Sequence, residues 1–175
     1  MAFTGGQLGL PLHPPVPRTG SNPSASRYSS IPLRRPAVSQ QNATKRKIVI
    51  VIADGTTAAR AANACALLAL TIGARHQDLI GPDTPDADGR LHAGISDTPV
   101  PVLVAPAEHL AELAQAQPPI EIIGFTKTAA GAHTYDKYTR ALAAVASADL
   151  EYLAVALIGP RAQVTSLTGS LPLYR

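Results

Sequence analysis

Apolar residues follow one another almost without interruption in two stretches of the chain, residues 47–53 and 152–160. Continuous runs of β-branched and aliphatic residues are typical of strands that are covered on both faces. Both stretches are therefore predicted to lie inside a sheet. Shorter apolar runs at residues 100–104 and 120–125 predict two further strands.

Helical spacing appears between these strands. A helix is predicted from Thr56 or Thr57 to about Ile72, and its core stripe has spacings of four, three and four: Ala61, Cys65, Leu68 and Ile72. Leu67 and Leu70 lie on its other side. Because this helix is apolar nearly all round, we expect it to pack between two layers or against a second subunit.

Three more helices are predicted, over residues 106–115, 134–146 and 161–167. Thr134 is the expected cap of the second of these, and Tyr135 and Tyr138 on its face are expected in the core. Residues 126–132 are predicted as a loop.

Residues 75–99 break the alternation and predict a loop-rich insertion. Asp88-Gly89 is a strong hairpin signal, with short arms expected around residues 79–80 and 90–92. Asp83, Asp86 and Asp88 lack the spacing of a calcium loop, so turn chemistry explains them better.

Alternation of strands and helices predicts an α/β fold. The expected architecture is a two-layer or three-layer sandwich with a mostly parallel, mixed central sheet of about four strands flanked by helices. Residues 47–175 are predicted to form this single domain, and residues 1–46 a disordered tail rich in Pro and Ser.

The distribution of charged residues also separates the predicted tail from the predicted domain. Residues 48–175 hold eight Lys and Arg against twelve Asp and Glu, a net −4, whereas all seven remaining Lys and Arg precede them. Nucleic-acid binding by the domain is therefore disfavoured. No stretch is apolar enough to predict a membrane span, and a cytoplasmic location is favoured over organellar targeting by the tail, whose prolines oppose an amphipathic helix.

Ligands of open α/β sheets gather beyond the carboxyl ends of the strands. The ends expected to meet there are residues 54–57, 125–128 and 159–161. We expect Asp54 to act as a general base or to hold a substrate amine, although an Asp that caps its own turn is an equal alternative. Lys127 is a candidate partner for a carboxylate or phosphate, or else a solvated loop lysine.

The remaining candidates are hydroxyl, amide and guanidinium groups. Thr126 is a candidate catalytic residue, and the candidate substrate-binding residues are Thr56, Thr57, Asn63, Thr128 and Arg161. Asn63 lies mid-helix, where lining the cleft and bonding a neighbouring loop are equal alternatives. Gly159-Pro160 opens the last predicted helix, where an anion could bind. A structural role is preferred for it, because proline removes one of the backbone donors that an anion would need.

The cysteine and the histidines add few further candidates for a catalytic or metal site. Cys65 lies in the core stripe and is expected to be inert. His92 and His133 are the best acid–base candidates among the histidines, and the histidine spacing predicts no metal site. Because the chain has no glycine-rich phosphate-binding loop, we expect no cofactor.

Several short motifs resemble two related families. Residues 47–54, Ala61-Ala62-Asn63, Gly159-Pro160 and Thr168-Gly169-Ser170-Leu171 resemble type II peptidyl-tRNA hydrolases. Those motifs, with Gly73-Ala-Arg-His76 and Asp86-Ala-Asp-Gly-Arg90, are more similar still to the "domain of unknown function 2000" family. The resemblance implies a peptidyl-tRNA hydrolase-like fold over residues 47–175. It also implies that most hydrolase catalytic positions are unmatched, since the lysine position falls on Ala59 and the aspartate position falls near Phe125.

Three functions remain open on these grounds. The first is a hydrolase-like enzyme that acts on an amide or ester of a small acylated substrate at the strand ends. The alternative is a non-catalytic module, either binding a small ligand or acting as a regulatory homodimer. A peptidyl-tRNA hydrolase in the strict sense ranks third, because the domain is acidic.

Overall fold

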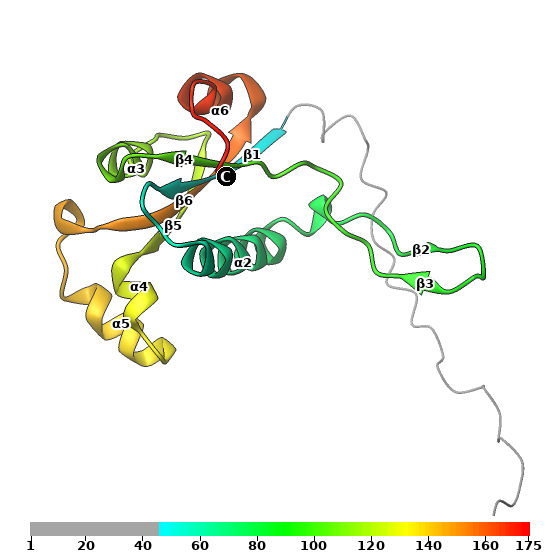
Figure 1. The fold of residues 1–175 in the computed structure, drawn as a ribbon, viewed down its shortest axis with the longest axis horizontal. Helices are drawn as coiled ribbons and strands as arrows, with labels where there is room; N and C mark the ends of the chain where they lie inside the picture. The colour runs from blue at the N-terminus through cyan, green and yellow to red at the C-terminus, as the bar shows by residue number, and fades with distance from the viewer. Residues whose placement is uncertain (1–45) are drawn as a thin grey trace, which may run out of the picture. The chain divides into compact units, whose positions relative to one another are not determined.

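A computed structural model of the chain describes residues 46–175 (Figure 1). The predicted disordered tail lies, apart from Arg46, outside the described residues. A central four-stranded sheet has the order β4-β1-β6-β5. Its strands are β1 (Arg46–Ala53), β4 (Val102–Ala105), β5 (Glu121–Thr126) and β6 (Tyr152–Pro160). This mixed α/β architecture confirms the predicted fold class, although only one of the three strand pairs is parallel where a mostly parallel sheet was expected.

The two continuous apolar runs form the two central strands. Residues 153–159 of β6 and 48–53 of β1 are all buried, as expected for strands with cover on both faces. β1 pairs in parallel with β4, whereas β6 is antiparallel to both β1 and β5. β1, β4 and β5 therefore run in one direction and β6 in the other.

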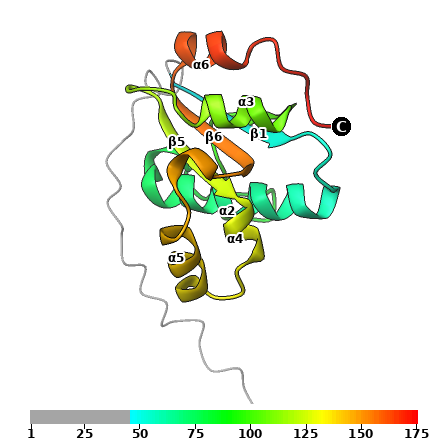
Figure 2. The same cartoon turned by 90° about the vertical axis from the view of Figure 1, so that its left-hand side faces the viewer.

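Helices cover both faces of the sheet, so that the domain has three layers (Figures 1 and 2). Side chains alternate between the faces along each strand. Ile48, Ile50 and Ile52 of β1 pack with α2 (Ala58–Arg75). Val49 and Val51 pack on the opposite face, with α3 (Ala107–Leu113) and α6 (Arg161–Thr168).

α2 is covered on one side only within residues 46–175. Its buried residues are Ala61, Ala64, Leu68 and Ile72, with Cys65 partly buried beside them. This confirms most of the predicted core stripe. Leu67 and Leu70 stay 44% and 72% exposed. The helix also continues through Gly73 to Arg75, past its predicted end.

The insertion after α2 contains η1 (Gln77–Leu79) and a hairpin of β2 (Thr84–Pro85) and β3 (Leu91–His92). The predicted turn at Asp88-Gly89 is present, and Gly89 has the positive φ of 80° that favours glycine. The first predicted arm is wrong, because Leu79 lies in η1 and Ile80 bridges to Ser96. Figure 1 shows the hairpin extending away from the sheet.

Residues 127–131, predicted as a loop, form a helix, α4 (Lys127–Gly131), which precedes α5 (Tyr135–Ala143). Thr134 caps α5, as predicted, by accepting a hydrogen bond from the Lys137 amide. The predicted core position of Tyr135 is wrong. This side chain is 77% exposed and α5 has no buried residue, because the helix packs mainly against α4 at the rim of the domain. A short η2 (Ser147–Asp149) leads to β6.

No helix within residues 46–175 has the length and apolar character needed to cross a membrane. The same residues contain no cluster of three or more side chains suited to holding a metal ion.

Candidate functional site

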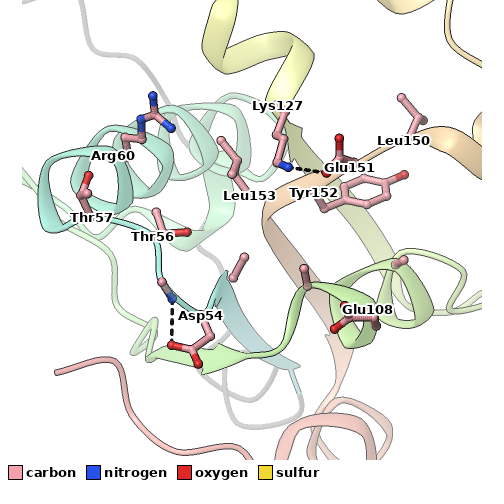
Figure 3. Close-up of a pocket in the computed structure, with 14 residues that line it drawn as sticks. Asp54, Thr56, Thr57, Arg60, Glu108, Lys127, Leu150, Glu151, Tyr152 and Leu153 are labelled. Atoms are coloured by element: carbon pink, nitrogen blue, oxygen red, sulfur yellow. Dashed lines mark hydrogen bonds and ion pairs between the residues drawn. The ribbon is translucent and has the colours of Figure 1, made fainter.

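The ends of three strands meet at one edge of the sheet. β1, β4 and β5 end there at Ala53, Ala105 and Thr126, and the antiparallel β6 begins there at Tyr152. A cavity of about 450 Å³ opens at this edge (Figure 3). Its polar and charged lining comes from the segment after β1, from α3, and from residues flanking β5 and β6: Asp54, Thr56, Thr57, Arg60, Glu108, Lys127, Glu151 and Tyr152.

Hydrogen bonds to backbone groups hold the segment between β1 and α2 in place. The Asp54 amide donates to the Ala105 carbonyl at 2.8 Å, which fixes the segment to the end of β4. Gly55 turns the chain with a φ of 74°, and its amide donates to Asp54 Oδ1 at 2.8 Å. From the far end of the chain, the Tyr174 hydroxyl donates to the Thr56 carbonyl at 2.9 Å. These contacts place the Asp54 carboxylate and both threonines at the cavity.

The amino end of α2 also faces the cavity. Thr57 is its cap residue but makes no side-chain cap bond, and the first turn has no acidic residue. The first helical hydrogen bond runs from the Ala61 amide to the Thr57 carbonyl, so the amides of residues 58–60 have no partner in the helix. This end of a helix carries partial positive charge, and Arg60 adds a full one.

The other walls bring charges of both signs. Lys127 Nζ forms an ion pair with a Glu151 oxygen, and the Lys127 amide donates to the Glu151 carbonyl at 2.8 Å. Glu108, on the first turn of α3, lines the cavity across from the Asp54 segment (Figure 3). Two cations, Arg60 and Lys127, and three carboxylates, Asp54, Glu108 and Glu151, therefore line the cavity.

The structure brings together four of the eight predicted site residues: Asp54, Thr56, Thr57 and Lys127. Thr126 is buried, and its hydroxyl caps α4 by accepting from the Ala129 amide at 3.2 Å. Thr128, on the second position of α4, is not among the residues that line the cavity. Thr126 is thus placed to fix the helix that follows Lys127.

Two predicted residues lie elsewhere. Asn63 is exposed because only one side of α2 is covered, and it lines no part of the cavity. Arg161 lies at the opposite edge of the sheet. The expectation that residues 159–161 join the other strand ends is wrong because β6 is antiparallel, which sets Pro160 beside Arg46 at the start of β1.

Arg60, Glu108, Glu151 and Tyr152 line the cavity without having been predicted. Arg60 could have been found from its place on the first turn of the helix after Thr57. Glu151 and Tyr152 had no such signal, because they reach this edge only through the direction of β6.

The other reactive side chains stand apart from the cavity. Burial raises the pKa of the Cys65 thiol, so this partly buried group stays protonated at neutral pH, as expected for an inert cysteine. His92 Nε2 pairs with Asp86 Oδ2 at 2.8 Å in the hairpin. His133 lines a separate groove between α2 and α5.

Comparison with known protein families finds one match. The model of the family described as "Protein of unknown function (DUF2000)" matches residues 46–175, which are all of the described residues. The chain belongs to this family. No curated protein matches the sequence.

Among solved structures, the domain is similar to the protein of unknown function Atu0240 from Agrobacterium tumefaciens str. C58. The TM-score is 0.68 and the sequence identity is 18%, over 75% of this chain and 98% of that chain. At this identity the similarity shows a shared fold alone.

Proposed function

We propose that this DUF2000 protein binds a small polar molecule in the cavity at the strand ends, as a binding module and not as an enzyme. The observation that carries the proposal is the convergence of Asp54, Thr56, Thr57, Arg60 and Lys127 on one cavity of about 450 Å³. A volume of this size lies within the usual range for small-ligand sites.

A carboxylate or phosphate is the group best suited to one wall. The amides at the start of α2 have no hydrogen-bond partner within residues 46–175, and they, the Thr56 and Thr57 hydroxyls and Arg60 are all donors or positive charges. Anions bind at such helix ends because amide groups and the helix dipole act together. Asp54 and Glu108 supply acceptors for an amine or amide N–H of the same ligand.

The lining also explains why binding is favoured over catalysis. Among its residues there is no histidine, cysteine or serine, so the Ser–His or Cys–His pairs that activate a nucleophile in many hydrolases cannot form there. Thr126, one of the predicted catalytic residues, is committed to a helix cap. Lys127 is committed to Glu151.

The test is equilibrium binding measured by calorimetry with glycine, N-acetylglycine and inorganic phosphate as probes. We expect binding of at least one probe, and a weakening on the order of tenfold or more in Arg60→Ala, since a charge-assisted hydrogen bond contributes about 1.5–3 kcal/mol. Arg161→Ala is the matched control, because this exposed arginine lies at the opposite edge. If no probe binds, or if both variants weaken binding equally, the cavity is not the site.

A hydrolase-like enzyme acting on a small acylated substrate is the second candidate. It is supported by Asp54, whose described hydrogen bond uses only Oδ1 and leaves Oδ2 available as a base toward water. The expected result is release of acetate from N-acetylglycine that Asp54→Asn abolishes. Failure of the wild-type protein to release acetate while still binding the probe would reject the enzyme and retain the binding module.

A type II peptidyl-tRNA hydrolase-like fold, and that activity, remain proposals from the motif resemblance. The net charge of −4 over residues 48–175 offers little attraction for RNA. Cleavage of N-acetyl-aminoacyl-tRNA that needs Asp54 would move this activity to first place. The cytoplasmic location also stays a prediction, which cell fractionation tests.

A further inference from the structure

The cavity at the strand ends has a polar side and an apolar side. Thr57 and Arg60 lie on one side, at the start of α2 (Figure 3). Leu150 and Tyr152, just before and at the start of β6, lie on the other side. Sites for small molecules commonly combine apolar walls with a few polar groups that orient the ligand. The lining therefore suits a ligand that has both a charged part and an apolar part.

Small side chains of α3 contribute to the apolar part of the lining. Ala107 and Ala111 are one turn apart on α3, and both line the cavity. Tyr152 packs into the same apolar layer as the buried residues of α3. Ala53 and Leu153, which are both buried, also line the cavity. Methyl groups, aliphatic side chains and one aromatic ring thus bound a space that suits an apolar side chain of a ligand.

Gly124 of β5 determines where the Tyr152 ring lies. A Cβ atom at Gly124 would lie 2.5 Å from Tyr152 Cε1 and 2.9 Å from Tyr152 Cδ1, which is too close for carbon atoms that are not bonded. Because glycine has no side chain, the ring can lie directly on the backbone of the neighbouring strand. The aromatic wall of the cavity is therefore supported by β5, and any larger residue at position 124 would displace it.

The charges of the lining favour a ligand that carries both an anion and a cation. Lys127 and Glu151 form an ion pair with each other. Within residues 46–175, Arg60, Asp54 and Glu108 form no ion pair. A carboxylate of the ligand suits Arg60, and a protonated amine suits Asp54, whose described hydrogen bond uses only Oδ1. A ligand with an anion alone would meet the net charge of −1 that the lining residues carry.

We propose that the cavity binds a free α-amino acid with a large apolar side chain, such as leucine or phenylalanine. The carboxylate of the amino acid binds at Arg60, its amine binds at Asp54, and its side chain packs on the Tyr152 ring. This inference rests on the proposed function, because it uses the same cavity, and it adds the chemical class of the ligand. Gly124 and Tyr152 then determine specificity, because they hold the apolar wall in place.

A series of ligands gives the first test, measured by calorimetry on the full-length chain. We expect L-leucine to bind on the order of tenfold or more tightly than glycine, because its side chain leaves water on binding. N-acetyl-L-leucine and L-leucinamide each lack one of the two charges, and both are expected to bind on the order of tenfold more weakly than L-leucine. Arg60→Ala is expected to weaken the binding of L-leucine by a similar factor.

A change at Gly124 tests the apolar wall. Gly124→Ala is expected to displace the Tyr152 ring and to reduce the preference for L-leucine over glycine to about threefold or less. Gly73→Ala is the matched control, because a Cβ atom at Gly73 meets nothing within 4 Å and this glycine lies near the end of α2 that is away from the cavity. Neither glycine has a positive φ, and circular dichroism checks that both variants fold. Ala111→Leu fills the same space from α3, and it should reduce the preference even if Gly124→Ala does not fold.

The outcomes separate this inference from the proposed function. If glycine or phosphate binds and needs Arg60, but L-leucine binds no more tightly than glycine, the amino-acid inference is overturned and the proposed function is retained. Equal binding of L-leucine and N-acetyl-L-leucine also overturns the inference, since the free amine would then contribute nothing. A preference for L-leucine that both Gly124→Ala and Ala111→Leu leave unchanged overturns the role of the apolar wall. If none of the probes binds, both proposals fail.

Discussion

The Thr126 hydroxyl has a structural role, although the sequence predicts a catalytic one. Thr126 is 5% exposed at the end of β5, and it closes the amino end of α4 by accepting from the Ala129 amide. The helix it caps begins with Lys127, which lines the cavity. Thr126 therefore affects the site by positioning its neighbour.

Replacing Thr126 separates these two roles. Thr126→Ala is expected to lower the free energy of unfolding by about 1 kcal/mol, the usual cost of losing a cap, whereas Thr126→Ser should retain most of the stability. Urea unfolding measures both. Ligand binding by the folded Ala variant is expected to fall no more than about threefold; a complete loss with wild-type stability would restore Thr126 to the binding or catalytic set.

Ion pairs join four elements, β1, η1, α2 and β5, at the sheet edge opposite the cavity. Arg46 at the start of β1 pairs with Asp78 in η1. Glu121 at the start of β5 accepts from Arg75 at the end of α2 and contacts His76 Nε2 at 2.8 Å. These contacts join both strands to the end of α2 and to the segment that follows it.

The pKa values of both carboxyl groups are lowered by these contacts. The hydrogen bond from Arg46 is the main cause for the pKa of Asp78. For Glu121, desolvation raises the pKa, but the hydrogen bonds and the positive charges of Arg75 and His76 together outweigh it. A carboxyl group whose pKa is lower in the folded state stabilises the protein above its unfolded pKa, and this contribution is lost as pH falls through the folded pKa.

Stability is therefore expected to fall as the pH decreases below about 4.5. The ordinary pKa values are 4.5 for Glu and 3.8 for Asp, and below them the unfolded chain takes up protons that the folded carboxylates still exclude. Urea unfolding between pH 7 and pH 3 measures this. Glu121→Gln should cost about 1 kcal/mol or less at pH 7, since the pair is partly exposed, and should flatten the acid slope. A slope identical to wild type would show that Glu121 does not contribute to it.

The whole domain depends on β1 and β6 because both apolar layers share them. Ile48, Ile50 and Ile52 contribute to the layer under α2, while Val49 and Val51 contribute to the layer under α3 and α6. Removing apolar volume from either layer should therefore weaken one cooperative unit and not a separate half.

Matched leucine truncations on the two faces test this coupling. Leu68→Ala under α2 and Leu110→Ala under α3, at 2% and 0% exposure, should each cost about 2–5 kcal/mol in a single transition followed by both fluorescence and circular dichroism. Leu173→Ala, at 56% exposure, should cost less than about 1 kcal/mol. Two separate transitions in either core variant would show that the layers unfold independently.

The sequence by itself determined the elements that depend on local pattern: the four strands, the core stripe of α2, the Asp88-Gly89 turn and the Thr134 cap. It also located half of the candidate site, since Asp54, Thr56, Thr57 and Lys127 follow directly from strand ends. Only the tertiary structure decided the direction of β6, because a strand buried on both faces has the same apolar pattern in either direction. That direction removed Arg161 from the cavity and brought Glu151 and Tyr152 to it. The tertiary structure also decided that one side of α2 stays uncovered. The spacing of apolar residues along a helix does not show this, because burial depends on neighbours that are distant in the chain.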